Sequence, residues 1–167
     1  GGCNSESVTV TVLPYACCNV PGAIYLYDER TSNGLIGNGG VYHVVDTLFV
    51  NNSIGYSNVT FWMDSMAVIY VEPGQTFSTI NCRFLPACPN MWSGIHLANA
   101  SARYESGRDY LESAWRGVWS KAGAPFDLRE TVFRGCWVGV FVGPNPNLGN
   151  GNPLHPGRIE GCNFGAT

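Results

Sequence analysis

The chain has 167 residues, of which 45% are hydrophobic and only 13% are charged, about half of the ~25% that is usual in soluble domains. The formal net charge is −3 and the sequence contains no run of basic residues, which argues against a nucleic-acid partner or an anionic membrane surface. No stretch approaches the ~18 consecutive apolar residues of a membrane span, so none is predicted.

Short apolar segments follow one another along the chain. Residues 40–50 and 57–63 contain alternating apolar positions and predict two β-strands. Further on, Trp-x-Gly recurs at Trp92, Trp115 and Trp137, which are 23 and 22 residues apart. Residues 66–71 (MAVIYV) fit the same place without the glycine. A period in the low twenties indicates a repeat architecture.

Each repeat passes through a turn to a second apolar strand. These strands end at an aromatic residue, namely Phe84, Tyr110, Phe133 and Phe164. The last interval is the longest, because residues 143–157 form a Pro-, Gly- and Asn-rich stretch that indicates an inserted loop.

We therefore predict an all-β fold, a right-handed parallel β-helix (β-solenoid) of about five or six coils. A β-sandwich is the alternative, but it does not require Trp-x-Gly at constant spacing, whereas stacked coils do. Two inward rows should fill the tube: Ile69, Ile95, Val118 and Val140 on one side, and Phe84, Tyr110, Phe133 and Phe164 on the other. Six further positions are predicted to be structural, as core tryptophans and corner glycines: Trp92, Gly94, Trp115, Gly117, Trp137 and Gly139.

The seven cysteines lie at positions 3, 17, 18, 82, 88, 136 and 162. Their spacing contains no paired Cys-x-x-Cys, so we predict no zinc site, and nothing else in the sequence implies a metal or cofactor. Buried free thiols and disulfides both remain open. The shortest disulfide loops would be Cys82–Cys88 and either Cys3–Cys17 or Cys3–Cys18.

The sequence predicts no catalytic residue. No two coils clearly place carboxylates at one position of the repeat; the nearest pair is Asp109 and Glu130, with Arg108, Arg129 and Arg134 as ion-pair partners. The histidines, His43, His96 and His155, are isolated, and His96 should point outward. A polysaccharide lyase or glycoside hydrolase, which needs such a carboxylate pair or a Ca²⁺ cluster, is an alternative function. Carbohydrate binding by Trp62 or Trp119 and the loop at 144–156 is another.

Three segments carry a resemblance to a known group of proteins: AVIYVEPGQTFSTINCRF, PACPNMWSGIHL and VFRGCWVGVFV. They resemble the right-handed parallel β-helix regions of Bacteroidota proteins exported by the type IX secretion system, and the likeness covers about residues 41–164. It implies a non-catalytic structural or adhesive module at the cell surface or outside the cell. Its partners would be the secretion machinery and an extracellular polysaccharide or cell-surface ligand.

The resemblance also divides the chain. Residues 1–14 are similar to the last strand of an Ig-like or PKD-type module, so we expect them to end such a module or to cap the solenoid. Residues 15–167 would be the parallel β-helix, continuing beyond the C-terminal end of this sequence. Asp46–Leu48 and Asp64–Met66 fit the Asp-Ser/Thr-apolar pattern of Bacteroidota O-glycosylation, with Thr47 and Ser65 as acceptors.

Overall fold

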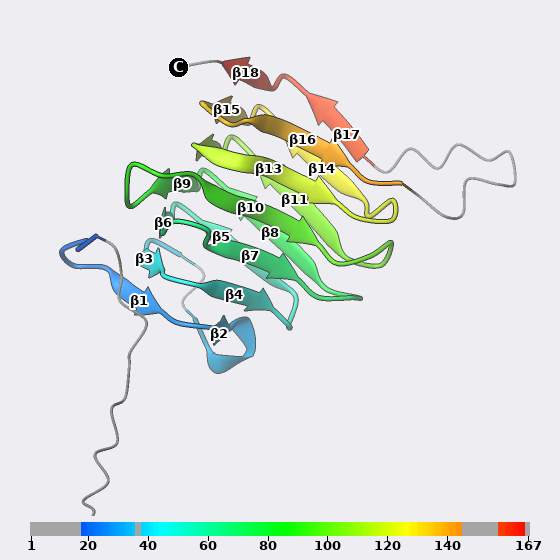
Figure 1. Ribbon diagram of the computed structural model, residues 1–167. Helices are drawn as coiled ribbons and strands as arrows, with labels where there is room; N and C mark the ends of the chain where they lie inside the picture. Colours follow the sequence, from blue (N-terminus) through cyan, green and yellow to red (C-terminus); the bar gives the residue numbers. More distant parts are fainter. Residues whose placement is uncertain (1–17, 36–37, 145–156, 166–167) are drawn as a thin grey trace, which may run out of the picture.

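The computed structural model describes residues 18–35, 38–144 and 157–165, and it is a β-solenoid of about five turns (Figure 1). Apart from one 3₁₀ turn at Thr31–Asn33, the regular elements of these ranges are β-strands. Every strand pairing is parallel, which excludes the sandwich. In Figure 1 the coils stack from the blue β1 and β2 to the red β17 and β18.

Three sheets run along the solenoid, and from β3 to β17 each full coil contributes one strand to each of them in turn. Sheet A consists of β1 (Ile24–Leu26), β3 (Val41–Val44), β6 (Thr60–Met63), β9 (Arg83–Pro86), β12 (Tyr110–Glu112), β15 (Val132–Arg134) and β18 (Asn163–Gly165). Sheet B consists of β2 (Glu29–Arg30), β4 (Thr47–Val50), β7 (Val68–Val71), β10 (Trp92–Leu97), β13 (Ala114–Ser120) and β16 (Val138–Val142). Sheet C consists of β5 (Ile54–Ser57), β8 (Thr76–Ile80), β11 (Arg103–Gly107), β14 (Phe126–Arg129) and β17 (Gly157–Glu160).

A coil thus has three strands, not the two that the sequence predicted. The second predicted strand of each repeat is split by a corner between sheets C and A, as at Asn81 between β8 and β9. The residue at this corner has a left-handed backbone in every coil, although only one of them is glycine. The five are Asn58, Asn81, Arg108, Glu130 and Gly161.

The predicted inward row of sheet B is confirmed, because Ile69, Ile95, Val118 and Val140 are paired in register. The row of sheet A was wrong at one position. Leu111, not Tyr110, pairs with Phe84 on one side and Phe133 on the other. Tyr110 lies one residue earlier and faces outward, since alternate residues of a strand point to opposite faces.

Trp92 is fully buried, as predicted, and its ring stacks on Phe84 at 6.1 Å. The other two tryptophans of the motif were wrongly assigned to the core. A register shift between Gly94 and Ile95 pairs Trp92 with Ala114, so Trp115 is displaced outward. The side chain of Trp115 is 46% exposed and that of Trp137 is 74% exposed.

The glycines of the motif are needed for different reasons. Gly94 has φ 107°, a backbone conformation that side chains resist, so glycine is needed there. However, it lies inside β10 at the register shift and not at the corner that was predicted. Gly117 and Gly139 do not have positive φ. They are needed because a Cβ at Gly117 would lie 2.6 Å from the carbonyl oxygen of Gly139, and one at Gly139 would lie 2.5 Å from the Phe164 ring.

The predicted disulfide between Cys82 and Cys88 is not formed. Cys82 is a free thiol inside the solenoid, and burial raises its pKa to about 11. Cys18 is also a free thiol, which removes the pairing with Cys3. The candidate pair Cys3–Cys17 lies outside the described residues, as do residues 1–14 and their predicted role.

Replacing Gly117 by alanine tests the close approach between coils. We expect Gly117→Ala to lower the free energy of unfolding by at least about 1–3 kcal/mol, because the new Cβ must displace the next coil or the Phe133 ring. Gly55→Ala is the matched control, since a Cβ at this strand glycine meets nothing within 4 Å. Chemical denaturation of both variants checks the prediction, and equal stability would show that the coil register is wrong.

Candidate functional site

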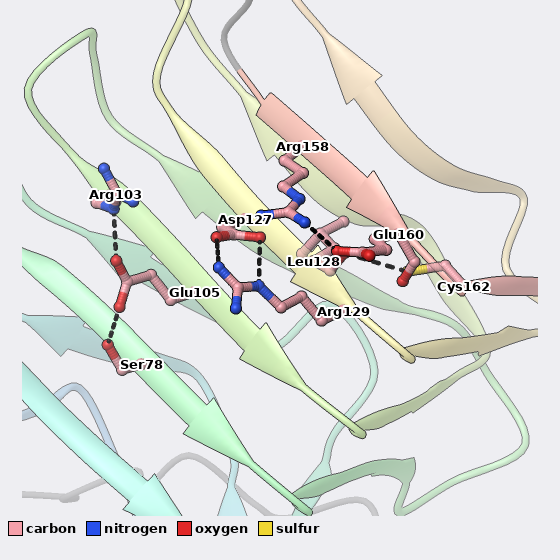
Figure 2. A network of polar contacts seen from close by, with 9 residues as sticks. All are labelled: Ser78, Arg103, Glu105, Asp127, Leu128, Arg129, Arg158, Glu160 and Cys162. Carbon is pink, nitrogen blue, oxygen red and sulfur yellow. Dashed lines mark hydrogen bonds and ion pairs between the residues drawn. The ribbon is translucent and has the colours of Figure 1, made fainter.

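The outward face of sheet C carries a network of ion pairs (Figure 2). In each pair the arginine and the carboxylate lie two residues apart on the same strand, so both side chains point outward. The pairs are Arg103–Glu105, Arg129–Asp127 and Arg158–Glu160. Glu105 also accepts a hydrogen bond of 3.1 Å from the hydroxyl of Ser78 on the preceding coil.

Glu105 and Asp127 are directly paired across β11 and β14, which corrects the prediction that no two coils place carboxylates at one position. A glycoside hydrolase needs one of two such groups to keep a proton at neutral pH. Arg129 instead donates two hydrogen bonds to Asp127 and lowers its pKa, while Arg103 donates to Glu105. The arrangement is that of exposed ion pairs, which contribute little to stability.

The pair that the sequence favoured, Asp109 and Glu130, does not come together. Glu130 is exposed at the corner with φ 51°. Asp109 follows the corner residue of its own coil and points into the solenoid, where its side chain is buried. Its expected arginine partners are elsewhere engaged or exposed; Arg129, for example, is bound to Asp127.

Asp109 instead organises a buried polar network. Its carboxylate accepts hydrogen bonds from the backbone N–H of Cys82 at 2.7 Å, from the hydroxyl of Ser106 at 2.6 Å and from the hydroxyl of Thr79. Ser106 is also bonded to Thr131 on the next coil at 2.6 Å. Burial raises the pKa of Asp109 although these hydrogen bonds act to lower it. The residue holds three coils together and has no access to a substrate.

The outward face of sheet B is aromatic. One row of side chains, paired in register from coil to coil, forms what we call the aromatic ladder: Phe49, Tyr70, His96, Trp119 and Phe141. Neighbouring rings meet edge to face, with centroids 4.8 Å apart between His96 and Trp119 and 6.2 Å apart between Trp119 and Phe141. The predictions that His96 points outward and that Trp119 lies on the surface are confirmed.

Cationic side chains lie over the rings of the aromatic ladder. The guanidinium carbon of Arg116 is 4.4 Å from the ring centre of Trp119 and 5.0 Å from that of Phe141. The ammonium nitrogen of Lys121 lies 4.2 Å from the ring centre of Trp119. Burial, together with these two positive charges, lowers the pKa of His96 to about 4, so this ring is neutral at physiological pH.

Trp115 and Trp137 stand beside the aromatic ladder, with ring centroids 5.9 Å apart. Between them and the ladder lies a groove of about 400 Å³, which we call the tryptophan groove. It is lined by Met66, Ser93, His96, Trp115, Arg116, Trp137, Val138 and Phe141. Its size is within the range of small-molecule sites. Trp115 and Trp137 are the most exposed of the aromatic side chains that line it.

The sequence contains a signal for this face that extends beyond His96, the residue predicted to point outward. Four members of the aromatic ladder directly follow the four residues of the predicted inward row, and strand alternation places each of them outside. What the alternation could not reveal is the outward position of Trp115 and Trp137, which depends on the register shift at Gly94.

The remaining predicted residues are dispersed. His43 is fully buried, with Nε2 3.4 Å from Asp64 Oδ1, and His155 lies outside the described residues together with most of the loop at 144–156. Trp62 is partly buried on the outward side of sheet A, away from the tryptophan groove. Thr47 begins β4 and donates a hydrogen bond to Asp46, and Ser65 lies in the turn between β6 and β7.

Within residues 18–35, 38–144 and 157–165, no three His, Cys, Asp or Glu side chains are grouped closely enough to hold a metal ion. The same part of the chain contains no helix with the length and apolar character needed to cross a membrane.

Comparison with known proteins adds no relative: no family model matches the chain, and no curated protein or solved structure matches it either.

The buried network predicts that Asp109 is structural. Asp109→Ala leaves the N–H of Cys82 and two hydroxyls without their acceptor, and we expect it to lower the free energy of unfolding by at least about 2 kcal/mol. Asp109→Asn keeps an acceptor and should be tolerated.

Because the pKa of Asp109 is raised in the folded protein, its contribution to stability is present at low pH and is lost as pH rises through that pKa. Asp109→Asn should remove this loss, as urea denaturation at several pH values would show. An alanine variant as stable as the wild type would contradict the network.

The lowered pKa of His96 predicts the opposite pH dependence of stability. The unfolded chain protonates this residue near pH 6.5, whereas the folded protein does so only at about 4, so stability present at pH 7 is lost as pH falls through this window. The loss should be up to about 3 kcal/mol, reduced by solvent screening of the partly exposed ring. His96→Phe, measured by thermal melting at pH 7 and pH 4.5, should be less sensitive to acid than the wild type. An unchanged difference between the two pH values would rule this out.

Proposed function

We propose that this chain is a non-catalytic β-solenoid module that adheres to a carbohydrate polymer through the tryptophan groove. The observation that carries the proposal is the pair of exposed indoles, Trp115 and Trp137, beside the aromatic ladder of sheet B. Apolar side chains of this size are usually buried, and several of them gathered at one surface mark a binding site.

The side chains of the groove suit a sugar. The C–H face of a pyranose ring is apolar and packs on an indole, while its hydroxyl groups need polar partners at the rim. Ser93 and Arg116 supply such partners among the aromatic residues that line the groove. A groove that is open and has both kinds of surface fits a polysaccharide better than a fully apolar ligand.

The repeat favours a polymer over a single sugar. Successive coils of a β-solenoid lie ~4.8 Å apart, and the aromatic ladder places one ring on each of five coils. A chain of repeated sugar units that runs along the solenoid axis therefore meets a similar surface at every step. Adhesion through many weak contacts suits a structural module better than catalysis at one point.

A non-catalytic role is supported by the carboxylates. The in-register pair Glu105 and Asp127 is bound by arginines, and Asp109 is enclosed in the core. None of the three has the exposed, proton-holding character of a general acid beside a second free carboxylate.

The location follows from the resemblance to exported Bacteroidota proteins. We place the module at the cell surface or outside the cell, as cargo of the type IX secretion system, whose machinery is then a second partner. Residues 1–14 would end an Ig-like module or cap the solenoid. Thr47 and Ser65, both partly exposed, would accept O-glycans in that setting.

Alanine substitution of the two indoles tests the function. We expect Trp115→Ala and Trp137→Ala each to weaken polysaccharide binding at least about tenfold, or ~1.4 kcal/mol, because each removes a stacking surface. Affinity gel electrophoresis with β-glucan, mannan, alginate and chondroitin sulfate provides the measurement, and circular dichroism confirms that the variants are folded.

Trp62→Ala is the control, since this tryptophan faces outward from sheet A. Loss of binding in this variant alone would place the site on sheet A, at Trp62, the other tryptophan that the sequence suggested for carbohydrate binding. A folded wild-type protein that binds none of the polysaccharides would overturn the proposed function.

A further inference from the structure

The cationic side chains on the outer faces of sheets B and C are held in different ways. On sheet C each of the three arginines has a carboxylate on its own strand, and on sheet B Arg30 is paired with Glu72 at 3.0 Å. Arg116 and Lys121 are the exceptions on sheet B. Neither side chain makes an ion pair or a hydrogen bond within the described residues, and both are held by aromatic rings instead.

A cation held by a ring keeps its hydrogen-bond donors available. The guanidinium carbon of Arg116 lies 4.4 Å from the ring centre of Trp119 and 5.0 Å from that of Phe141, and its N–H groups make no hydrogen bond to another group within the described residues. These donors match the paired oxygens of a carboxylate or a sulfate. Lys121, the only lysine of the chain, has three donors on a flexible stem and is held by ring contacts to Trp119 and Tyr70.

The two cations lie where a ligand of the groove would pass. Arg116 lines the tryptophan groove, and Lys121, one residue beyond the end of β13, lies 4.2 Å from the ring centre of Trp119. Since the chain as a whole has a net charge of −3, an acidic polymer gains little from the rest of the surface. Arg116 and Lys121 are the cations that lie beside the tryptophan groove, so they would supply the attraction for an anionic ligand bound there.

From this distribution we propose that the tryptophan groove takes an acidic polysaccharide, whose carboxylate or sulfate groups are bound by Arg116 and Lys121. The inference rests on the proposed function, because it requires that a glycan lies in the groove. Trp115 and Trp137 pack on the sugar rings, and Arg116 and Lys121 bind the anionic substituents. The polymer is then selected by charge as well as by its apolar faces.

The test compares four polymers on the wild-type protein: alginate as a polyuronate, chondroitin sulfate as a sulfated glycan, a neutral β-glucan, and poly-L-glutamate as an acidic polymer without sugar. We expect binding to one or both of the acidic glycans, and the arm that binds identifies the anionic group. Raising the salt concentration should weaken binding, since the charges are partly exposed.

Charge-removing variants locate the anion site. Arg116→Gln and Lys121→Gln should each weaken acidic-glycan binding about fivefold or more and reduce its salt dependence, while Lys121→Arg retains binding. Arg103→Gln is the matched control, because it changes the net charge by the same amount on sheet C and should leave binding unchanged. Thermal melting confirms that each variant is folded.

The outcomes separate the two proposals. Binding of the neutral glucan as tightly as the acidic glycans, with no effect of Arg116→Gln or Lys121→Gln, overturns the acidic ligand but leaves carbohydrate adhesion intact. Binding of poly-L-glutamate as tightly as the acidic glycans shows that the site recognises charge alone, which overturns the glycan in both proposals. Equal losses in Arg116→Gln and Arg103→Gln would show only a net-charge effect and would also overturn the anion site.

Discussion

The in-register hydrogen bonding between successive coils is the constraint on which the rest of this structure depends. Because each strand pairs in parallel with its neighbour ~4.8 Å away, every side chain lies directly against the one at the same position of the next coil. Phe61 and Phe84 stack with their planes only 4° apart for this reason. Gly157 is required for the same reason, since a Cβ there would lie 2.1 Å from the Phe126 ring of the preceding coil.

The same constraint makes polar residues inside the tube possible only as groups that satisfy one another. Thr79 and Ser106 are paired in register, and Asp109 lies close enough to accept a hydrogen bond from each. A single polar residue at this depth would lose its water without a replacement partner. The polar network therefore joins in-register residues of successive coils as the aromatic core does, with hydrogen bonds in place of ring contacts.

The sequence was sufficient where side chains of one kind recur at a regular interval. The row from Ile69 to Val140 was predicted correctly because β-branched residues keep the spacing of the coils. It was insufficient where the interval changes by one residue, since such a change moves a side chain to the opposite face. Tyr110 was placed in the core instead of Leu111 for this reason, and the register shift at Gly94 moved Trp115 outside.

The carboxylate pair was missed through the same error. If Tyr110 is aligned with Phe133, the preceding strands β11 and β14 are misaligned by one residue. Glu105 and Asp127, which are paired in the structure, are then not at the same position of the repeat. The corner between sheets C and A was missed as well, because two of its five left-handed residues, Arg108 and Glu130, carry no turn signal. The candidate site could thus be predicted only in part: Trp119 and His96 followed from alternation, but the groove between them and Trp137 required the register.

The outward faces of sheets B and C show why the number of cationic side chains alone does not locate an anion site. On sheet C an incoming anion would compete with a carboxylate that is already bound, as Asp127 is to Arg129, and little free energy would be gained by the exchange. On sheet B Arg116 is held against the rings of Trp119 and Phe141, and within the described residues its donors form no hydrogen bond or ion pair. The ring contacts also reduce the loss of side-chain entropy when a ligand binds, because the guanidinium is already placed. A cation held by aromatic rings is therefore both ordered and available, and these are the two properties that a recognition site for an acidic glycan requires.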